Sequence, residues 1–399
     1  MNAPSPRRPL DGVRVLEMGQ LIAGPFAGCI LGYFGAEVIK IESPGSGDAL
    51  RQWRVLRDGT SLWWSSLGRN KKSVSLNLRS DKGRAVARQL ALKSDVLIEN
   101  FRPGTMEKWG LGPKELAAEN PALVYARISG YGQTGPYASR PGFASVCEGI
   151  GGLRYINGFP GEAPVRPNLS LGDSLAGLHA AFGVVLALLE QRSSGNNGQV
   201  VDVAIYESIF NMLEAVVPEF DGAGVVREPS GSTLTGIAPT NTYRCADGKF
   251  IVIGANGDSI FQRLMVAIGH ADLAGDPRFA HNPGRVEHQD ILDGIIGEWT
   301  TRQTSENALR VLDEADVPSG PIYNAKDMLN DPHFNARGLF ENVMVGGEPL
   351  KIPAIAPKLT NTPGTTQWPG PVEVGEHTRE VLSDLLGMSA EELDALEAT

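Results

Sequence analysis

The first 130 residues alternate between short apolar runs and longer segments with helical spacing, and this alternation restricts the fold more than any other feature of the chain. Parallel strands need a crossover connection, which is usually a helix. The pattern therefore predicts an α/β fold with a large doubly wound, Rossmann-like domain. The expected strands are 13–17, 37–41, 96–99 and 123–129, and the expected helices are 25–34, 81–93 and 113–119.

Residues 130–172 interrupt this alternation with many glycines and prolines, and loops of this length are usually functional or disordered. A helix is expected at 174–191. Its apolar run, 175–189, is shorter than the roughly 18 to 20 residues of a membrane span. The run therefore predicts a buried helix, and no membrane partner is expected.

The rest of the chain predicts a smaller α+β domain. A strand is expected at 199–203, then a helix to about Val216 and a linker at 221–239. Asp247-Gly248 is a turn signal for a hairpin at 243–254, and mostly helical sequence follows to Ala315. Short strands at 350–355 and a helix at 378–386 are too small to bury a core alone, so we expect them to pack on the first domain.

Charge, cysteine and histidine content exclude several classes of protein. The chain has 36 Lys and Arg against 46 Asp and Glu, a net charge of −10, which argues against a nucleic-acid partner. Three widely separated cysteines indicate that no disulfide framework is present and fit a reducing cytoplasm. The first ten residues are not followed by the apolar core of a signal peptide. His281 and His288 flank Glu287 without H-E-x-x-H spacing, so no metal site is predicted.

Common cofactor and nucleophile motifs are missing from the sequence. Gly19, Gly24 and Gly28 follow the first strand and Glu42 ends the second, but G-x-G-x-x-G does not occur, so a dinucleotide site is disfavoured. Gly24 and Gly28 alternatively allow the helix to pack closely on the sheet. No G-x-S-x-G sequence occurs, and Cys147 is interpreted as a buried cysteine.

Asp173 lies where a glycine-bearing segment meets the expected apolar helix, in the sequence Leu171-Gly-Asp-Ser174. Two interpretations stay open: its carboxylate caps backbone N–H groups, or the helix dipole keeps it ionised as a nucleophile. The basic residues of the N-terminal half indicate either a site for a polyanionic small molecule or a solvated charged face. They are Arg51, Lys71, Lys72, Arg79, Arg102 and Lys108.

Seven motifs follow one another along the chain: 13–42, Gly47-Asp48 with Arg51, Asn70 to Ser73, Asp95 to Gly104, Ser129 to Pro136, Leu171 to Ser174 and Gly375 to Thr378. In this order they resemble the class III CoA-transferases, the family of the formyl-CoA:oxalate and carnitine CoA-transferases. The resemblance covers residues 9–399.

The resemblance implies a domain plan and an oligomeric state. A large CoA-binding α/β domain would comprise 1–204 and 326–399, a linker 205–229, and a small α+β domain with a second linker 230–325. Each monomer would form a ring, and two rings would interlock as a homodimer.

The resemblance also implies a covalent mechanism. Asp173 would attack an acyl-CoA thioester, and aspartyl anhydride and aspartyl-CoA thioester intermediates would pass CoA to a carboxylic acid. Coenzyme A would be a substrate, with no permanently bound cofactor, and backbone N–H groups near the glycine-rich segments would stabilise the oxyanions. The implied CoA contacts are Leu76, Arg79, Asn100, Phe101, Arg102 and Lys108.

Departures from the family pattern bear on the acceptor. Oxalate-type members have a glutamine where this chain has Ile22, with Gln20 two residues earlier, so oxalate is disfavoured. Residues 149–161, which include Arg154, and the later Arg166 are closer to members that use succinyl-CoA with malate, citramalate, mesaconate or glutarate. Gln20, Arg154 and Arg166 are therefore the candidate contacts of a dicarboxylic acceptor.

Two alternatives remain. An α-methylacyl-CoA racemase of the same fold needs a histidine base, but its Gly-His-Asp is Gly142-Phe143-Ala144 here, and no histidine precedes His179. A non-catalytic acyl-CoA-binding protein would use Asp173 only as a helix cap.

Overall fold

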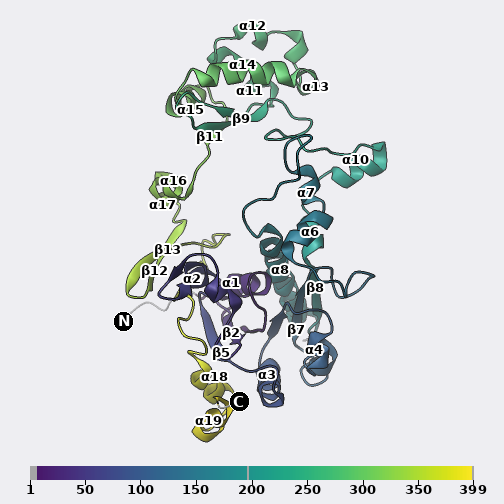
Figure 1. Ribbon diagram of the computed structural model, residues 1–399, viewed down its shortest axis with the longest axis vertical. Helices are drawn as coiled ribbons and strands as arrows, with labels where there is room; N and C mark the ends of the chain where they lie inside the picture. Colours follow the sequence, from purple (N-terminus) through teal and green to yellow (C-terminus); the bar gives the residue numbers. More distant parts are fainter. Residues whose placement is uncertain (1–6, 196, 398–399) are drawn as a thin grey trace. The chain divides into compact units, whose positions relative to one another are not determined.

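The computed structural model describes residues 7–195 and 197–397. Contacts divide the chain into two units (Figure 1). The first comprises Met1–Leu153, Pro167–Glu214 and Asn335–Thr399, and the second comprises Arg154–Arg166 and Ala215–Phe334. The domain limits implied by the family resemblance stay a prediction.

The first unit contains a six-stranded parallel sheet in the order β5-β2-β1-β6-β7-β8. Because the order runs outward in both directions from β1 and β6, it is the strand order of the dinucleotide-binding α/β folds, which bind ligands where the order reverses. The expected α/β fold with a parallel sheet is confirmed. The strands are β1 (Arg14–Glu17), β2 (Glu37–Glu42), β5 (Lys71–Ser75), β6 (Val96–Glu99), β7 (Val124–Ser129) and β8 (Val200–Ala204).

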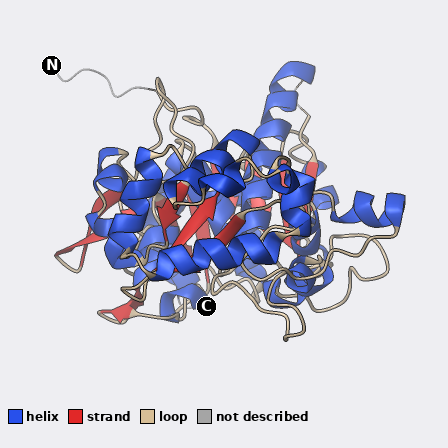
Figure 2. Ribbon diagram, turned by 90° about the horizontal axis from the view of Figure 1, so that it is seen from above, coloured by secondary structure: helices blue, strands red, loops and turns tan. Residues whose placement is uncertain are grey.

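Helices cover both faces of the sheet, as Figure 2 shows with strands in red and helices in blue. Neighbouring side chains of a strand point to opposite faces, so Val15 joins one buried core and Leu16 the other. The first core includes α1 (Ala23–Tyr33) and α8 (Leu171–Ser194). The second includes α3 (Asp81–Leu92), α18 (Thr378–Leu386) and α19 (Ala390–Glu397).

The C-terminal segment packs on the edge strand β5. The backbone N–H of Ser75 donates to the Thr378 hydroxyl (2.9 Å), and the N–H of His377 donates to the carbonyl of Ser73 (2.9 Å). The other elements of the first unit are η1 (Ala49–Gln52), β3 (Leu56–Arg57), β4 (Thr60–Ser61), α2 (Leu62–Leu67), α4 (Thr105–Lys108), α5 (Pro113–Ala117), α6 (Ala144–Ile150), α9 (Ile205–Phe210), β12 (Phe340–Val345) and β13 (Glu348–Pro353).

The second unit has its own core around a three-stranded antiparallel sheet, β11-β10-β9. The hairpin expected at 243–254 is confirmed, with its turn between β9 and β10. The elements of the second unit are α10 (Val216–Ala223), β9 (Thr240–Arg244), β10 (Phe250–Gly254), α11 (Asp258–Ala267), α12 (Ala271–Ala274), η2 (Pro277–Phe279), α13 (Asn282–Glu287), α14 (Gln289–Thr301), α15 (Ser305–Glu314), β11 (Ser319–Pro321) and α16 (Ala325–Asn330). Two short helices, α7 (Leu153–Ile156) and α17 (Pro332–Ala336), span the limits between the units.

Two expectations about helices were wrong. The helix expected to continue to about Val216 ends at Phe210, and a separate helix, α10, begins at Val216. The apolar helix α8 was expected to be buried, but only one face packs on the sheet and on α1. By length and composition α8 is able to cross a membrane. Its exposed face carries Leu178, Phe182, Val185, Leu186 and Leu189.

Candidate active site

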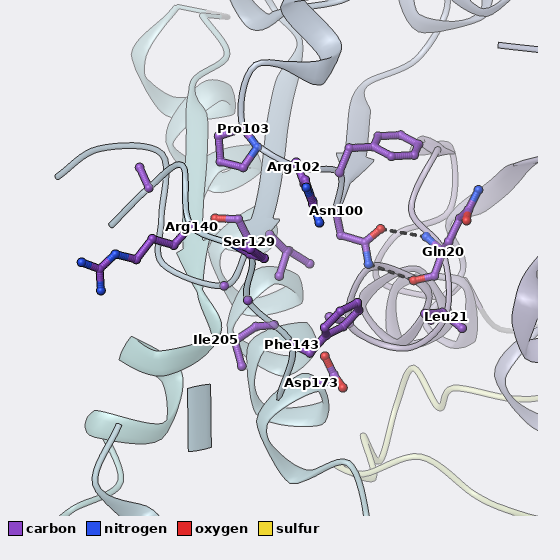
Figure 3. A pocket seen from close by; sticks show the side chains of 17 residues that line it. Gln20, Leu21, Asn100, Arg102, Pro103, Ser129, Arg140, Phe143, Asp173 and Ile205 are labelled. Atoms are coloured by element: carbon purple, nitrogen blue, oxygen red, sulfur yellow. Dashed lines mark hydrogen bonds between the residues drawn. The ribbon is translucent and has the colours of Figure 1, made fainter. Parts of the chain in front are cut away.

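A pocket opens at the carboxyl ends of the strands, where the strand order reverses between β1 and β6 (Figure 3). Its empty volume is about 910 Å³, part of it open to solvent. In open α/β sheets this is the place where ligands bind. The lining comes from residues that follow β1 and β6, from the end of β7, from the loop that follows β7, and from the starts of α8 and α9. These residues are Gln20, Leu21, Ala23, Asn100, Phe101, Arg102, Pro103, Ile128, Ser129, Gly130, Ala138, Arg140, Pro141, Gly142, Phe143, Asp173 and Ile205.

An amide side chain closes the gap between β1 and β6. Asn100 Oδ1 accepts the backbone N–H of Gln20 (2.8 Å), and Asn100 Nδ2 donates to the Gln20 carbonyl (2.8 Å) (Figure 3). The fit is close, because a Cβ on Gly19 would lie 3.1 Å from Asn100 Oδ1. The two loops that carry the predicted contacts Gln20 and Asn100 are therefore held against each other.

Leu21, the residue after Gln20, has a left-handed backbone conformation with a φ of 64°. A residue with a Cβ is strained in this region, and such strain persists where the surroundings fix it. Here the backbone N–H of Leu21 donates to Asp48 Oδ1 (3.0 Å), and Lys40 Nζ donates to the Gly19 carbonyl (2.7 Å). The N–H groups of Gln20 and Leu21 are thus engaged within the fold and do not face a substrate oxyanion.

A buried network of opposite charges lies below this turn. Lys40 Nζ is 3.0 Å from Glu17 Oε1 and 2.8 Å from Asp48 Oδ2, and Lys71 Nζ is 2.7 Å from Glu17 Oε2. Burial disfavours the charged form of Lys40, but Asp48 and Glu17 outweigh it and raise the pKa of Lys40. The Lys40 ammonium therefore stays charged, and these contacts fix the pocket wall from behind.

Glu42, at the end of β2, has a structural role. Its carboxylate accepts two bonds from Arg51 (2.7 Å each) and one from the Ser73 hydroxyl (2.6 Å). A ribose-binding acid of a dinucleotide site must face the ligand, whereas Glu42 is 1% exposed. The same contacts remove Arg51 from the set of candidate phosphate ligands.

Asp173 lies in the first turn of α8, at the third residue of a 24-residue helix. The residue before the helix is Ser170, so Asp173 is not the N-cap itself. Asp173 is half-buried, lines the pocket, and sits where the helix dipole favours a negative charge. This is the environment that keeps a carboxylate nucleophile ionised.

Two buried residues of α6 lie next to the start of α8. Burial, reinforced by the charges of Asp173 and Glu148, raises the pKa of the Cys147 thiol to about 11. Cys147 is fully buried and donates to the Gly130 carbonyl (3.3 Å), as expected for a structural cysteine. Glu148 is also fully buried and accepts the backbone N–H of Gly172 (3.3 Å), which fixes the residue preceding Asp173.

The predicted CoA contacts divide into two groups. Asn100, Phe101 and Arg102 line the pocket together with Asp173 and Gln20, whereas the remaining three are not among its lining residues. Leu76 follows β5 directly and is buried, and the other two are exposed, Arg79 before α3 and Lys108 at the end of α4. The three stay predicted contacts of a ligand larger than this pocket.

The two arginines predicted to contact the acceptor, Arg154 and Arg166, belong to the second unit. Sequence reasoning missed Ser129 and Arg140, which line the pocket of the first unit. The guanidinium of Arg140 stacks on the ring of Tyr137, 3.7 Å from its centroid, and points away from Asp173 in Figure 3. Ser129 is the last residue of β7, the strand next to β6. Because ligands bind at the carboxyl ends of such strands, the predicted strand 123–129 could have identified Ser129 as a candidate site residue.

Phe143 lines the pocket at the place of the histidine that a racemase requires. A phenyl ring neither accepts nor donates a proton, so proton abstraction has no base at this position. The pocket, an α/β switch-point site with one carboxylate at a helix N-terminus, is suited to nucleophilic catalysis.

Comparisons with known proteins identify the family of this chain. The model of CoA-transferase family III matches residues 10–378. The chain is 48% identical over 403 residues to the succinyl-CoA–D-citramalate CoA-transferase of Chloroflexus aurantiacus, covering 100% of this chain and 99% of that protein. It is 43% identical over 392 residues to the alpha subunit of the succinyl-CoA–L-malate CoA-transferase of the same organism, covering 97% and 91%.

A solved structure shows the same fold. The crystal structure of a CAIB/BAIF family protein from Brucella suis superposes with a TM-score of 0.84 at 32% identity, covering 95% of this chain and 100% of that one. The chain belongs to CoA-transferase family III, and it is therefore a class III CoA-transferase.

Proposed function

We propose that this enzyme moves CoA from succinyl-CoA to a dicarboxylic acid, with Asp173 as the covalent nucleophile. The observation that carries the proposal is the position of Asp173, a carboxylate at a helix N-terminus that shares one pocket with Gln20, Asn100 and Arg102. A carboxylate nucleophile conserves the energy of a thioester by exchanging it for an anhydride, whereas water would lose that energy by hydrolysis.

The proposed reaction balances without any external proton. A carboxylate oxygen of Asp173 attacks the thioester carbonyl carbon of the donor, the C–S bond breaks, and an anhydride and CoA thiolate form. The thiolate attacks the aspartyl carbonyl, which releases the donor acid and leaves an aspartyl-CoA thioester. The acceptor carboxylate displaces CoA to form a second anhydride, and the thiolate then takes the acceptor acyl group and restores Asp173.

The substrate class is taken from the relatives. One is named for succinyl-CoA and D-citramalate and another for succinyl-CoA and L-malate. Both acceptors are dicarboxylic acids, and a guanidinium matches the geometry of a second carboxylate. Arg154 and Arg166 are proposed to bind that carboxylate, and Gln20 is proposed to contact the acceptor.

The remaining parts of the proposal are the CoA contacts, the assembly and the location. Phe101, Arg102 and Asn100 would contact the thioester end of CoA, with Leu76, Arg79 and Lys108 around the nucleotide. The chain would act as an interlocked homodimer in the cytoplasm, with CoA as substrate and no resident cofactor.

Trapping of the acyl-enzyme tests the proposal directly. The purified protein is mixed with succinyl-CoA without an acceptor, treated with hydroxylamine, and digested for peptide mass mapping. We expect a hydroxamate on Asp173 that is absent when CoA replaces succinyl-CoA. A hydroxamate on another residue, or transfer to citramalate without any labelling, would remove Asp173 from the mechanism.

A further inference from the structure

Arg127 of β7 forms a clamp on the segment that follows β6. Its side chain is only 6% exposed. Its Nε donates to Glu99 Oε1 (2.8 Å), while Nη1 and Nη2 donate to the two carboxylate oxygens of Glu107 (2.6 and 3.2 Å). Parallel pairing of β6 with β7 places Arg127 directly opposite Glu99. One guanidinium therefore binds a carboxylate at each end of residues 99–107.

The segment between these carboxylates supplies the pocket wall. We name Asn100 to Gly104 the β6–α4 loop; Glu107 lies in the helix that follows it. Glu99 Oε2 accepts the backbone N–H of Phe101 (2.8 Å), so the carboxylate held by Arg127 also fixes the loop backbone. Asn100, Phe101 and Arg102 all lie on this loop and line the pocket.

A second side chain of β7 reinforces the clamp. The hydroxyl of Tyr125, two residues before Arg127 and on the same face of the strand, donates to the carbonyl of Leu111 (2.8 Å). The guanidinium of Arg127 lies over the Tyr125 ring, 5.7 Å from its centroid. Both ends of the segment 100–111 are thereby attached to one buried strand.

We propose that Arg127 is a positioning residue for the thioester substrate: by binding Glu99 and Glu107 together it holds the β6–α4 loop in the conformation that binds CoA. This inference rests on the proposed function. Only arginine has the fork that binds Glu107 through two parallel bonds while a third donor reaches Glu99. Arg127 does not line the pocket, so its effect on the substrate passes through the loop.

The test compares Arg127→Lys and Glu107→Gln with a matched control, Arg14→Lys. Arg14 Nε binds Glu37 Oε2 (2.7 Å) where the neighbouring strands β1 and β2 begin, so the control alters an arginine–glutamate pair at the amino ends of the strands, opposite to the pocket. For each protein we would measure kcat and KM with succinyl-CoA and citramalate, the Kd of CoA by calorimetry, the Tm, and hydrogen exchange of the peptide 100–111.

We expect both clamp variants to raise the KM for succinyl-CoA and the Kd of CoA about tenfold, equivalent to about 1.4 kcal/mol. The KM for citramalate and kcat should change less than about twofold, and exchange should increase only in 100–111. The control should match the wild type in KM and in exchange of that peptide. A residue that served stability alone would lower Tm and leave this KM unchanged.

Three results would overturn the inference: an unchanged KM for succinyl-CoA in both variants, equal effects on kcat and KM for both substrates, or unchanged exchange of 100–111. If Arg127→Lys does not fold, Glu107→Gln decides alone, because the side chain of Glu107 is 39% exposed and tolerates the change. If the wild type did not bind CoA, the proposed function would be refuted as well. If the wild type bound CoA and the variants Arg127→Lys and Glu107→Gln behaved like it, only the positioning role of Arg127 would be refuted.

Discussion

At the scale of single residues, a substitution of Asp173 should affect catalysis much more than stability. We expect Asp173→Asn to abolish CoA transfer, because an amide cannot form the anhydride. Asparagine has nearly the same shape, and the loss of the interaction between the charge and the helix dipole is worth about 0.3 to 1 kcal/mol. The measurements are the steady-state rate and the free energy of unfolding in urea.

Glu190→Gln is the matched control, since it removes a carboxylate from the exposed part of the same helix, far along the chain from Asp173. It should retain full activity. Transfer at more than a few per cent of the wild-type rate by Asp173→Asn would leave Asp173 as a residue of the helix terminus without a catalytic role.

Glu99 gives a prediction on pH. Burial raises the pKa of its carboxyl to about 7, against the bonds from Arg127 and the Phe101 N–H, which lower it. Because this pKa is higher in the folded chain than in the unfolded one, the contribution of Glu99 to stability is fully present below its ordinary pKa and is lost as pH rises through about 7. Glu99→Gln should remove that loss, on the order of 3 kcal/mol.

The measurement is urea unfolding of wild type and Glu99→Gln at several pH values between 5 and 8. Glu37→Gln is the control, because the bonds from Arg14 and Lys72 overcome desolvation and lower the pKa of Glu37. Stability from a lowered pKa is lost only as the solution becomes more acidic than this range. Parallel pH profiles for wild type and Glu99→Gln would contradict the assignment.

Individual site residues were predictable where the signal is local. Asp173 follows from a short motif at the start of an apolar helix, and both can be recognised in the sequence. The bonds between Asn100 and Gln20 join residues 80 positions apart. These bonds form because β1 and β6 are neighbours in the sheet, and the sequence alone does not give the order of the strands. Arg140 lies in an irregular loop, where residue spacing does not predict which way a side chain points.

At the scale of elements, the glycines of α1 determine how closely it packs on the sheet. A Cβ on Gly28 would lie 2.0 Å from Glu17 Oε2, the oxygen that pairs with Lys71. We expect Gly28→Ala to destabilise the protein by about 3 kcal/mol or more, because it breaks a buried ion pair, although alanine favours helices by about 1 kcal/mol over glycine. Urea unfolding measures the change.

The control for this change is Gly149→Ala in α6, where a Cβ would have no atom within 4 Å. Here only helix propensity acts, so stability should rise by up to about 1 kcal/mol. An increase of similar size at Gly28 would show that α1 can move away from the sheet and that the close approach is unimportant.

The strand β5 shows why some elements escaped prediction. Its sequence begins with Lys71 and Lys72, and two adjacent lysines suggest a solvated surface. In the fold, Lys71 is fully buried because Glu17 neutralises it, and Lys72 pairs with Glu37 and Glu380. The partners come from other strands and from the C-terminal helix, so the periodicity of the segment alone could not reveal a buried strand.

At the scale of the whole molecule, the exposed face of α8 needs a partner. Leu178 is 49%, Phe182 60% and Leu189 65% exposed on a single chain. A large exposed apolar patch marks a protein–protein or membrane interaction site, and we interpret this face as a protein interface. This face supports the proposed homodimer, although the relative that is named an alpha subunit shows that the family also contains enzymes with two kinds of chain.

We therefore expect the purified chain alone to sediment as a dimer of twice its 42.6 kDa, and dilution to nanomolar concentration should not release a folded monomer. Phe182→Glu places a charge on the apolar face, and burying an unpaired charge is strongly unfavourable, so this variant should lose the dimer and unfold at lower urea. Glu190→Gln, on the same helix, should sediment like the wild type.

If subunits interlock, dissociation requires local unfolding, so mixing two differently tagged wild-type proteins should give no mixed dimers until both are denatured and refolded together. A stable, folded monomer at micromolar concentration in analytical ultracentrifugation, or rapid exchange of subunits under native conditions, would contradict the interlocked assembly.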